Sequence, residues 1–149
     1  MPIATREAQT VWEGSLARGA GTVTSGSGAL GELPVTWASR TERPDGMTSP
    51  EELIAAAHSS CFSMALSLKL GELDAPPERL TVKAACTLDE VDGAPRITGV
   101  ALTVHARVPG RARADFDRAL EGAAALCPVS NALRGNLEIS VAAELDDGA

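Results

Sequence analysis

The order of strand-like and helix-like patterns along the chain predicts an α+β fold, with a mostly antiparallel sheet around one long central helix. Short strands fill the first third, and a long helix, two alternating strands, a second helix and a last strand follow. The chain has 149 residues, which is enough to bury its own core, and no repeat or linker divides it. We therefore expect residues 1–149 to form a single domain.

Glycine-rich turns punctuate the first third of the chain. Three strands are expected there, at residues 9–14, 20–25 and 33–37, and a polar loop follows at residues 38–48. Ser49 then suits a helix N-cap, Pro50 the first helical position and Glu52 the third position of a capping box. The helix should run to about Leu70 and stop at Gly71. Because it is apolar nearly all round, we expect it to be covered on most sides.

The second half of the chain alternates with period two in three stretches and carries one helical stripe. The alternation predicts strands at residues 80–88, 100–108 and 137–145. Asp92-Gly93 is typical of a hairpin turn between the first two of these strands. The helix should start near Arg113, stop at Pro128 and be followed by a short helical turn that ends near Leu133.

The formal net charge of −7 gives the surface a sign that repels phosphate, which argues against nucleic acid and anionic membranes as partners. The first ten residues hold no apolar run of signal-peptide length, and the long apolar helix is interrupted by serines, a histidine and a lysine. We therefore expect a cytoplasmic protein that does not span a membrane.

Three cysteines occur, without a Cys-x-x-Cys motif, so neither a disulfide framework nor a zinc site is indicated. Cys61 lies deep in the long helix and is either a buried small hydrophobe or a thiolate that an arginine upstream of the helix stabilises. Cys127 either benefits from the helix dipole beyond Pro128 or completes the apolar stripe of the helix before it. Cys86 lies on the apolar face of a strand, which favours a structural role.

Ionisable side chains near Cys61 permit two interpretations. Glu51 and Glu52 open the helix as ordinary first-turn acids, and Glu52 fits the capping box, which leaves Glu51 less explained. His58 lies one turn before Cys61, where a core histidine is favoured over a Cys-His nucleophile pair. His105 alternates with the apolar face of its strand and should be exposed, and no spacing of these residues indicates a metal site.

Two cysteine motifs resemble those of the OsmC/Ohr family, the osmotically inducible protein C and organic hydroperoxide resistance proteins. Residues 49–67, SPEELIAAAHSSCFSMALS, resemble the family's signature helix, and residues 127–133, CPVSNAL, its second cysteine motif. Trp12-Glu13-Gly14, Arg18-Gly19 and Gly21-Thr22-Val23 resemble the osmotically inducible branch. The resemblance covers essentially the whole chain.

The resemblance implies an OsmC-like intertwined homodimer with two long central helices and active sites at the subunit interface. It implies reduction of organic hydroperoxides by two cysteines without heme, flavin or metal, with a dithiol such as dihydrolipoamide as reductant. The family's first cysteine corresponds to Cys61, its second to Cys127 and its helix-start glutamate to Glu51. Its arginine corresponds to Arg18 in one branch and to Arg40 in the other, and the N-terminal third favours Arg40.

Glu51 and Cys61 are ten residues apart, about 15 Å along an unbroken helix. If both serve one site, we expect Glu51 to come from the partner subunit. The expected chemistry is oxidation of Cys61 to a sulfenic acid, followed by a disulfide with Cys127. Apolar side chains are expected to line the pocket, namely Leu53, Phe62, Met64 and Trp37.

Two other functions stay open at this point. One is a non-enzymatic dimer that binds a small apolar ligand at its interface, with the cysteines as packing residues. The other is a general thiol-disulfide oxidoreductase, against which the absence of Cys-x-x-Cys weighs.

Overall fold

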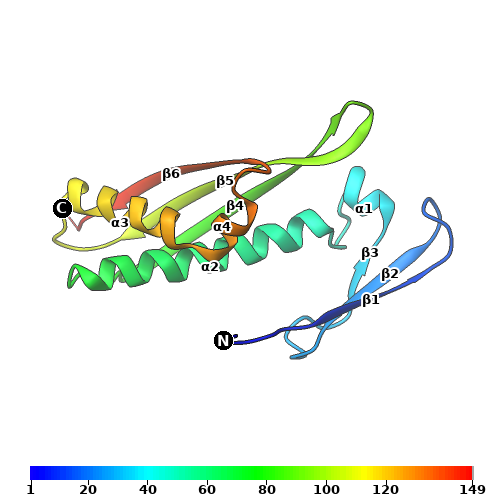
Figure 1. The fold of residues 1–149 in the computed structure, drawn as a ribbon, viewed down its shortest axis with the longest axis horizontal. Coiled ribbons are helices and arrows are strands. Elements are labelled where there is room, and N and C mark those ends of the chain that lie inside the picture. Colours follow the sequence, from blue (N-terminus) through cyan, green and yellow to red (C-terminus); the bar gives the residue numbers. More distant parts are fainter. Residues whose placement is uncertain (149) are drawn as a thin grey trace. The chain divides into compact units, whose positions relative to one another are not determined.

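The computed structural model describes residues 1–148 and has the α+β architecture that the sequence predicts (Figure 1). The chain divides into two compact units, Met1–Leu53 and the part that begins at Ile54. Each unit contains one three-stranded sheet. The elements in chain order are β1 (Ala8–Glu13), β2 (Ala20–Ser25), β3 (Leu33–Val35), α1 (Trp37–Thr41), α2 (Pro50–Glu72), β4 (Arg79–Val91), β5 (Ala94–Arg107), α3 (Arg113–Leu126), α4 (Pro128–Leu133) and β6 (Glu138–Asp146).

The first unit is built on the antiparallel sheet β1-β2-β3. Gly21 in the central strand pairs with Trp12 on one side and with Val35 on the other. A Cβ atom at Gly21 would lie 2.9 Å from both of these side chains. Because the glycine has no side chain, Trp12 and Val35 can close over the middle of the sheet.

A short helix, α1, replaces the first part of the loop predicted at residues 38–48, and β3 ends at Val35 before it. Thr36 and Ser39 form a reciprocal capping box, in which each hydroxyl accepts the other residue's backbone N–H, at 3.0 and 2.9 Å. The loop prediction was wrong because serine stands where the usual box has Glu or Gln, and because five residues are too few for a periodic pattern.

The long helix α2 begins where the sequence predicts, and the Ser49 hydroxyl accepts the N–H of Glu52 at 3.1 Å. The Glu52 carboxylate, however, accepts the Thr48 hydroxyl at 2.9 Å. The predicted stop at Gly71 is displaced, because α2 continues to Glu72.

The helix ends in a Schellman motif in which Asp74 takes the left-handed conformation at φ 54°. The Ala75 N–H donates to the carbonyl of Leu70 at 2.9 Å, and the Asp74 N–H donates to that of Gly71 at 3.0 Å. Aspartate tolerates the left-handed region better than most residues, so glycine is not required there.

The sheet of the second unit has the order β4-β5-β6. The predicted hairpin is confirmed, because Asp92 and Gly93 both have positive φ, 52° and 78°, and connect the antiparallel strands β4 and β5. Strand β6 pairs with β5 in parallel, after a crossover through α3 and α4. The sheets are thus mostly antiparallel, with one parallel pair.

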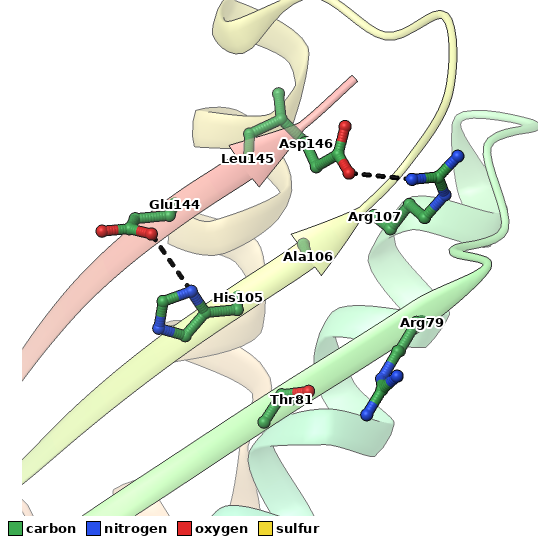
Figure 2. Close-up of a pocket in the computed structure, with 8 residues that line it drawn as sticks. All are labelled: Arg79, Thr81, His105, Ala106, Arg107, Glu144, Leu145 and Asp146. Atoms are coloured by element: carbon green, nitrogen blue, oxygen red, sulfur yellow. Dashed lines mark hydrogen bonds and ion pairs between the residues drawn. The ribbon is translucent and has the colours of Figure 1, made fainter. Parts of the chain in front are cut away.

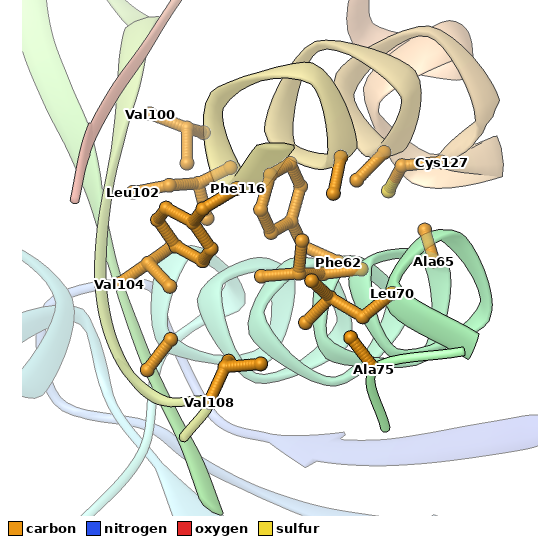
Figure 3. Packing of buried hydrophobic residues seen from close by; sticks show 14 residues of the cluster. Phe62, Ala65, Leu70, Ala75, Val100, Leu102, Val104, Val108, Phe116 and Cys127 are labelled. Carbon is orange, nitrogen blue, oxygen red and sulfur yellow. The ribbon is translucent and has the colours of Figure 1, made fainter. Parts of the chain in front are cut away.

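The core of the second unit lies between the helices and one face of this sheet (Figure 3). Helix α2 contributes Phe62, Leu66 and Leu70, α3 contributes Phe116, Ala119 and Ala123, and β5 contributes Val100, Leu102 and Val104. On the opposite face, polar and charged side chains such as Arg79, Thr81 and Arg107 line a pocket (Figure 2). His105 is exposed there, as the sequence predicts, and contacts Glu144 at 3.1 Å.

Only one face of α2 is covered within a single chain. Met64 and Leu68 are 72% and 53% exposed, whereas Phe62 and Leu66 on the covered face are fully buried. The helix is long and apolar enough to span a membrane by length and composition, but its inner face belongs to the core of the second unit.

Candidate functional site

Cys61 and Cys127 are in contact within the second unit. Their sulfur atoms are 3.3 Å apart, whereas a disulfide bond measures about 2.05 Å, so both residues are free thiols in contact. Cys61 projects from α2, and Cys127 occupies the single residue between α3 and α4.

Local structure explains the position of Cys127. Its backbone N–H donates to the carbonyl of Ala123 and closes α3, while its own carbonyl accepts the N–H of Asn131 and opens α4. Pro128 occupies the first position of α4, where its missing N–H costs nothing. The side chain is fully buried with Phe116 and Ala123, so the predicted apolar stripe is present.

The two thiols have different electrostatic environments. Burial raises the pKa of Cys61, and a hydrogen bond from the Val129 backbone opposes it only in part. Burial acts in the same direction at Cys127, but hydrogen bonds from the Ser130 hydroxyl and amide, from Cys61 and from the Val129 amide outweigh it and lower the pKa of Cys127.

His58 is a fully buried histidine that contacts Ser130. Its Nε2 lies 2.7 Å from the Ser130 Oγ, and its Nδ1 has no hydrogen-bond partner within residues 1–148. Burial lowers the pKa of His58, so the ring is neutral. The favoured interpretation as a core histidine agrees with this burial. Ser130 was not singled out in the sequence, although it lies three residues after Cys127, in the first turn of α4.

A separate cluster in the first unit contains Arg40 and Glu51. The guanidinium Nε and Nη2 lie 3.1 and 2.9 Å from Oε1 of the carboxylate, which is a charge-assisted fork. Glu51 is only 6% exposed, so the ion pair accounts for the acid that capping left unexplained. The guanidinium also lies 5.9 Å from the ring centroid of Trp37. Arg18, the other candidate, lies in the turn between β1 and β2.

Arg40 borders a cleft of about 370 Å³ in the first unit. The cleft is lined by Thr10, Trp12, Leu16, Val23, Val35, Thr36, Trp37, Arg40, Pro50 and Leu53. Trp37 and Leu53 were predicted to line a pocket and do so. Phe62 and Met64 do not line this cleft, because Phe62 is buried in the core of the second unit and Met64 is exposed on α2. Helical periodicity does not reveal which face of an all-apolar helix is inward.

Residues 43–142 match the family model described as OsmC-like protein. The chain is 43% identical over 134 residues to peroxiredoxin OsmC of Escherichia coli K12, covering 90% of this chain and 93% of that protein. It is 29% identical over 97 residues to an organic hydroperoxide resistance protein of Xanthomonas axonopodis pv. citri, covering 63% of this chain and 65% of that protein.

The same fold is found in the crystal structure of the organic hydroperoxide resistance protein OhrB of Bacillus subtilis. That chain is 26% identical and superimposes with a TM-score of 0.73, over 93% of this chain and 98% of its own length. The family model covers about two thirds of the residues, and the match to peroxiredoxin OsmC extends over nearly all of them. This protein therefore belongs to the OsmC-like family.

Proposed function

We propose that this protein is a cysteine-based peroxidase that reduces organic hydroperoxides to alcohols, with Cys61 as the attacking thiol and Cys127 as the resolving thiol. The observation that carries the proposal is the 3.3 Å contact between the two sulfurs, in a chain that shares its family with proteins named peroxiredoxin and organic hydroperoxide resistance protein. Such enzymes serve the cell as antioxidants under stress.

The chemistry proceeds in three balanced steps. The Cys61 thiolate attacks one oxygen of the peroxide, the O–O bond breaks, and the departing alkoxide takes a proton to become an alcohol. The Cys127 thiolate then attacks the sulfur of the Cys61 sulfenic acid, and hydroxide leaves as water after protonation. A dithiol of the dihydrolipoamide class reduces the disulfide by two exchange steps.

Cys61 requires a cation, because burial raises its pKa and the groups that hydrogen-bond it are neutral. We assign this role to Arg40, which Glu51 holds in place. On the continuous helix α2, Glu51 and Cys61 are ten residues apart, about 15 Å along the axis. The Arg40–Glu51 pair that activates a given Cys61 is therefore proposed to come from the partner subunit of a homodimer.

The exposed face of α2 supports this homodimer. Met64 and Leu68 are large apolar side chains that are mostly exposed in one chain, on a helix that otherwise lies in the core. A second copy of the same helix is the simplest surface to cover them, through a two-fold symmetric contact. No requirement for nucleic acid or membrane follows from this assembly, and a cytoplasmic location remains our expectation.

The cleft beside Arg40 favours an organic substrate. Two tryptophans and aliphatic side chains line it, and one guanidinium is available to polarise the peroxide oxygens. The hydrocarbon part of an organic hydroperoxide would bury apolar surface there, whereas hydrogen peroxide has none to bury.

The experiment that tests the function compares consumption of cumene hydroperoxide and hydrogen peroxide with dihydrolipoamide as reductant. The intact protein should consume the organic peroxide faster, Cys61→Ser should abolish turnover, and Cys86→Ser should retain it as the matched cysteine control. If the intact protein consumes neither peroxide, the proposal fails, and the apolar cleft would instead favour a protein that binds a small apolar ligand.

A further inference from the structure

One face of the β1-β2-β3 sheet forms an apolar wall of the cleft beside Arg40. Trp12 pairs with Gly21, and Gly21 pairs with Val35, so these three residues form one row across the same face of the sheet. Trp12 and Val35 line the cleft, and so does Val23, two residues along β2 from Gly21. The apolar wall of Trp12, Val23 and Val35 is therefore built within the first unit.

The indole ring of Trp12 is fixed at both of its ends. Its Nε1–H donates to the carbonyl of Gly14 at 3.0 Å. Its Cε3 atom lies over Gly21, 2.9 Å from the position that a Cβ atom would take there. Trp12 is still 39% exposed, and its one polar atom is already bonded within the chain. The ring therefore offers apolar surface to a molecule in the cleft.

The cleft separates a polar end from this apolar wall. Among the described residues that line it, Arg40 is the one that carries a charge. The Thr36 hydroxyl oxygen already accepts the backbone N–H of Ser39, at 3.0 Å. The peroxide oxygens are the polar part of an organic hydroperoxide, so their place is at Arg40. The carbon group is then left to the apolar wall, where burial of hydrocarbon is favourable.

We propose that Trp12 is a specificity-determining residue, whose fixed ring contacts the carbon group of the hydroperoxide and selects bulky, uncharged groups over small ones. The inference rests on the proposed peroxidase function and deepens it, because it assigns a preference among organic hydroperoxides to one side chain. Cumene hydroperoxide carries a phenyl group where tert-butyl hydroperoxide carries a methyl group. The phenyl group has more apolar surface to bury against the ring, so cumene hydroperoxide is the preferred substrate of the two.

The first test compares kcat/KM for these two peroxides, with dihydrolipoamide as reductant. Trp12→Ala should lower kcat/KM for cumene hydroperoxide by about tenfold, and that for tert-butyl hydroperoxide by less than about threefold. The loss should appear as a higher KM with kcat retained, because the ring contacts the carbon group equally before and during the reaction. Trp12→Phe, which keeps a flat aromatic ring, should retain most of the preference.

Two further variants separate the position of the ring from its presence. Gly21→Ala keeps Trp12 but places a Cβ atom 2.9 Å from its Cε3 and from the Val35 Cγ1, so the ring must shift and the preference for cumene hydroperoxide should fall. Val11→Ala is the matched control and should keep both kcat/KM values. Val11 is next to Trp12 on β1, faces the other side of the sheet and is 52% exposed. Thermal unfolding checks that each variant is folded.

The second test needs no peroxide and therefore stands apart from the peroxidase function. Its probe is 2-phenyl-2-propanol, the unreactive alcohol that corresponds to cumene hydroperoxide. By isothermal titration calorimetry, the intact protein should bind this alcohol about tenfold more tightly than Trp12→Ala does. Such a difference without turnover of either peroxide would reject the peroxidase function and keep the role of Trp12. An unchanged ratio of the two kcat/KM values in Trp12→Ala, or equal affinities for the alcohol, would overturn the inference.

Discussion

The cysteine pair and the arginine beside the cleft are held in place by different kinds of interaction. Cys61 and Cys127 are brought together by hydrophobic packing, and their hydrogen-bond partners are neutral amides, a hydroxyl and each other. Arg40 is held by a charge-assisted fork to a buried carboxylate beside an apolar cleft. The proposed nucleophile and the proposed cation are therefore each positioned by contacts within their own unit. A substitution of one should leave the position of the other unchanged.

Cys127→Ser should produce the largest effect. The variant should still react once with cumene hydroperoxide, because Cys61 and Arg40 are intact, but turnover with dihydrolipoamide should fall by about a hundredfold or more. A sulfenic-acid trap followed by mass spectrometry checks that Cys61 accumulates in the oxidised form. Sustained turnover would mean that the Cys61 sulfenic acid is reduced without Cys127.

Arg40→Ala should slow the first reaction of Cys61 with peroxide by about a hundredfold, since one positioned cation that stabilises developing charge is lost. Stopped-flow mixing measures this phase directly. Arg18→Ala is the matched control and should react within about a factor of two of the intact protein. A larger loss of rate in Arg18→Ala than in Arg40→Ala would assign the role of the stabilising cation to Arg18, in the turn between β1 and β2.

Glu51→Gln should slow the same first reaction by about tenfold, a smaller effect because the guanidinium remains but loses its charged anchor. The side chains have nearly the same shape, so thermal unfolding should change little beyond the loss of one ion pair. Rates equal to those of the intact protein would show that Arg40 needs no carboxylate to stay in place.

Subunit mixing tests whether the two regions meet across the dimer. Cys61→Ser should be inactive and Arg40→Ala about a hundredfold slower than the intact protein. A re-equilibrated equal mixture should recover about a quarter of the intact activity, since half of the proposed dimers then hold one complete site of two. Mixing Cys61→Ser with Cys127→Ser should recover nothing, because both changes fall in the same cysteine pair. Recovery in neither mixture would place Arg40 and Cys61 in one subunit.

Local signals in the sequence account for most of the fold. Ser49-Pro50 marks the start of α2 and Asp92-Gly93 the hairpin, because caps and turns depend on neighbouring residues alone. Helix α1 was missed because its serine-based cap has no strong signature. The parallel pairing of β6 with β5 depends on a crossover through two helices, which period-two alternation does not encode.

The sequence indicated the individual residues of the candidate site but not the contacts between them. Cys61, Cys127, Arg40 and Glu51 were found through motif resemblance, and the contacts within each pair follow from the structure. The partnership of His58 with Ser130 joins residues 72 positions apart, so no local pattern could reveal it. Long-range contacts of this kind are set by packing of whole elements rather than by spacing.

The exposed apolar face of α2 has a consequence for biosynthesis. A newly made chain presents a 23-residue helix with the length and composition of a membrane span, and, if the proposed homodimer forms, Met64 and Leu68 face water until a second copy covers them. Encounter between subunits is a bimolecular event, so the waiting time shortens as the protein becomes abundant. Rapid synthesis would then shorten the time for which this apolar face of each new chain is open to capture by a chaperone.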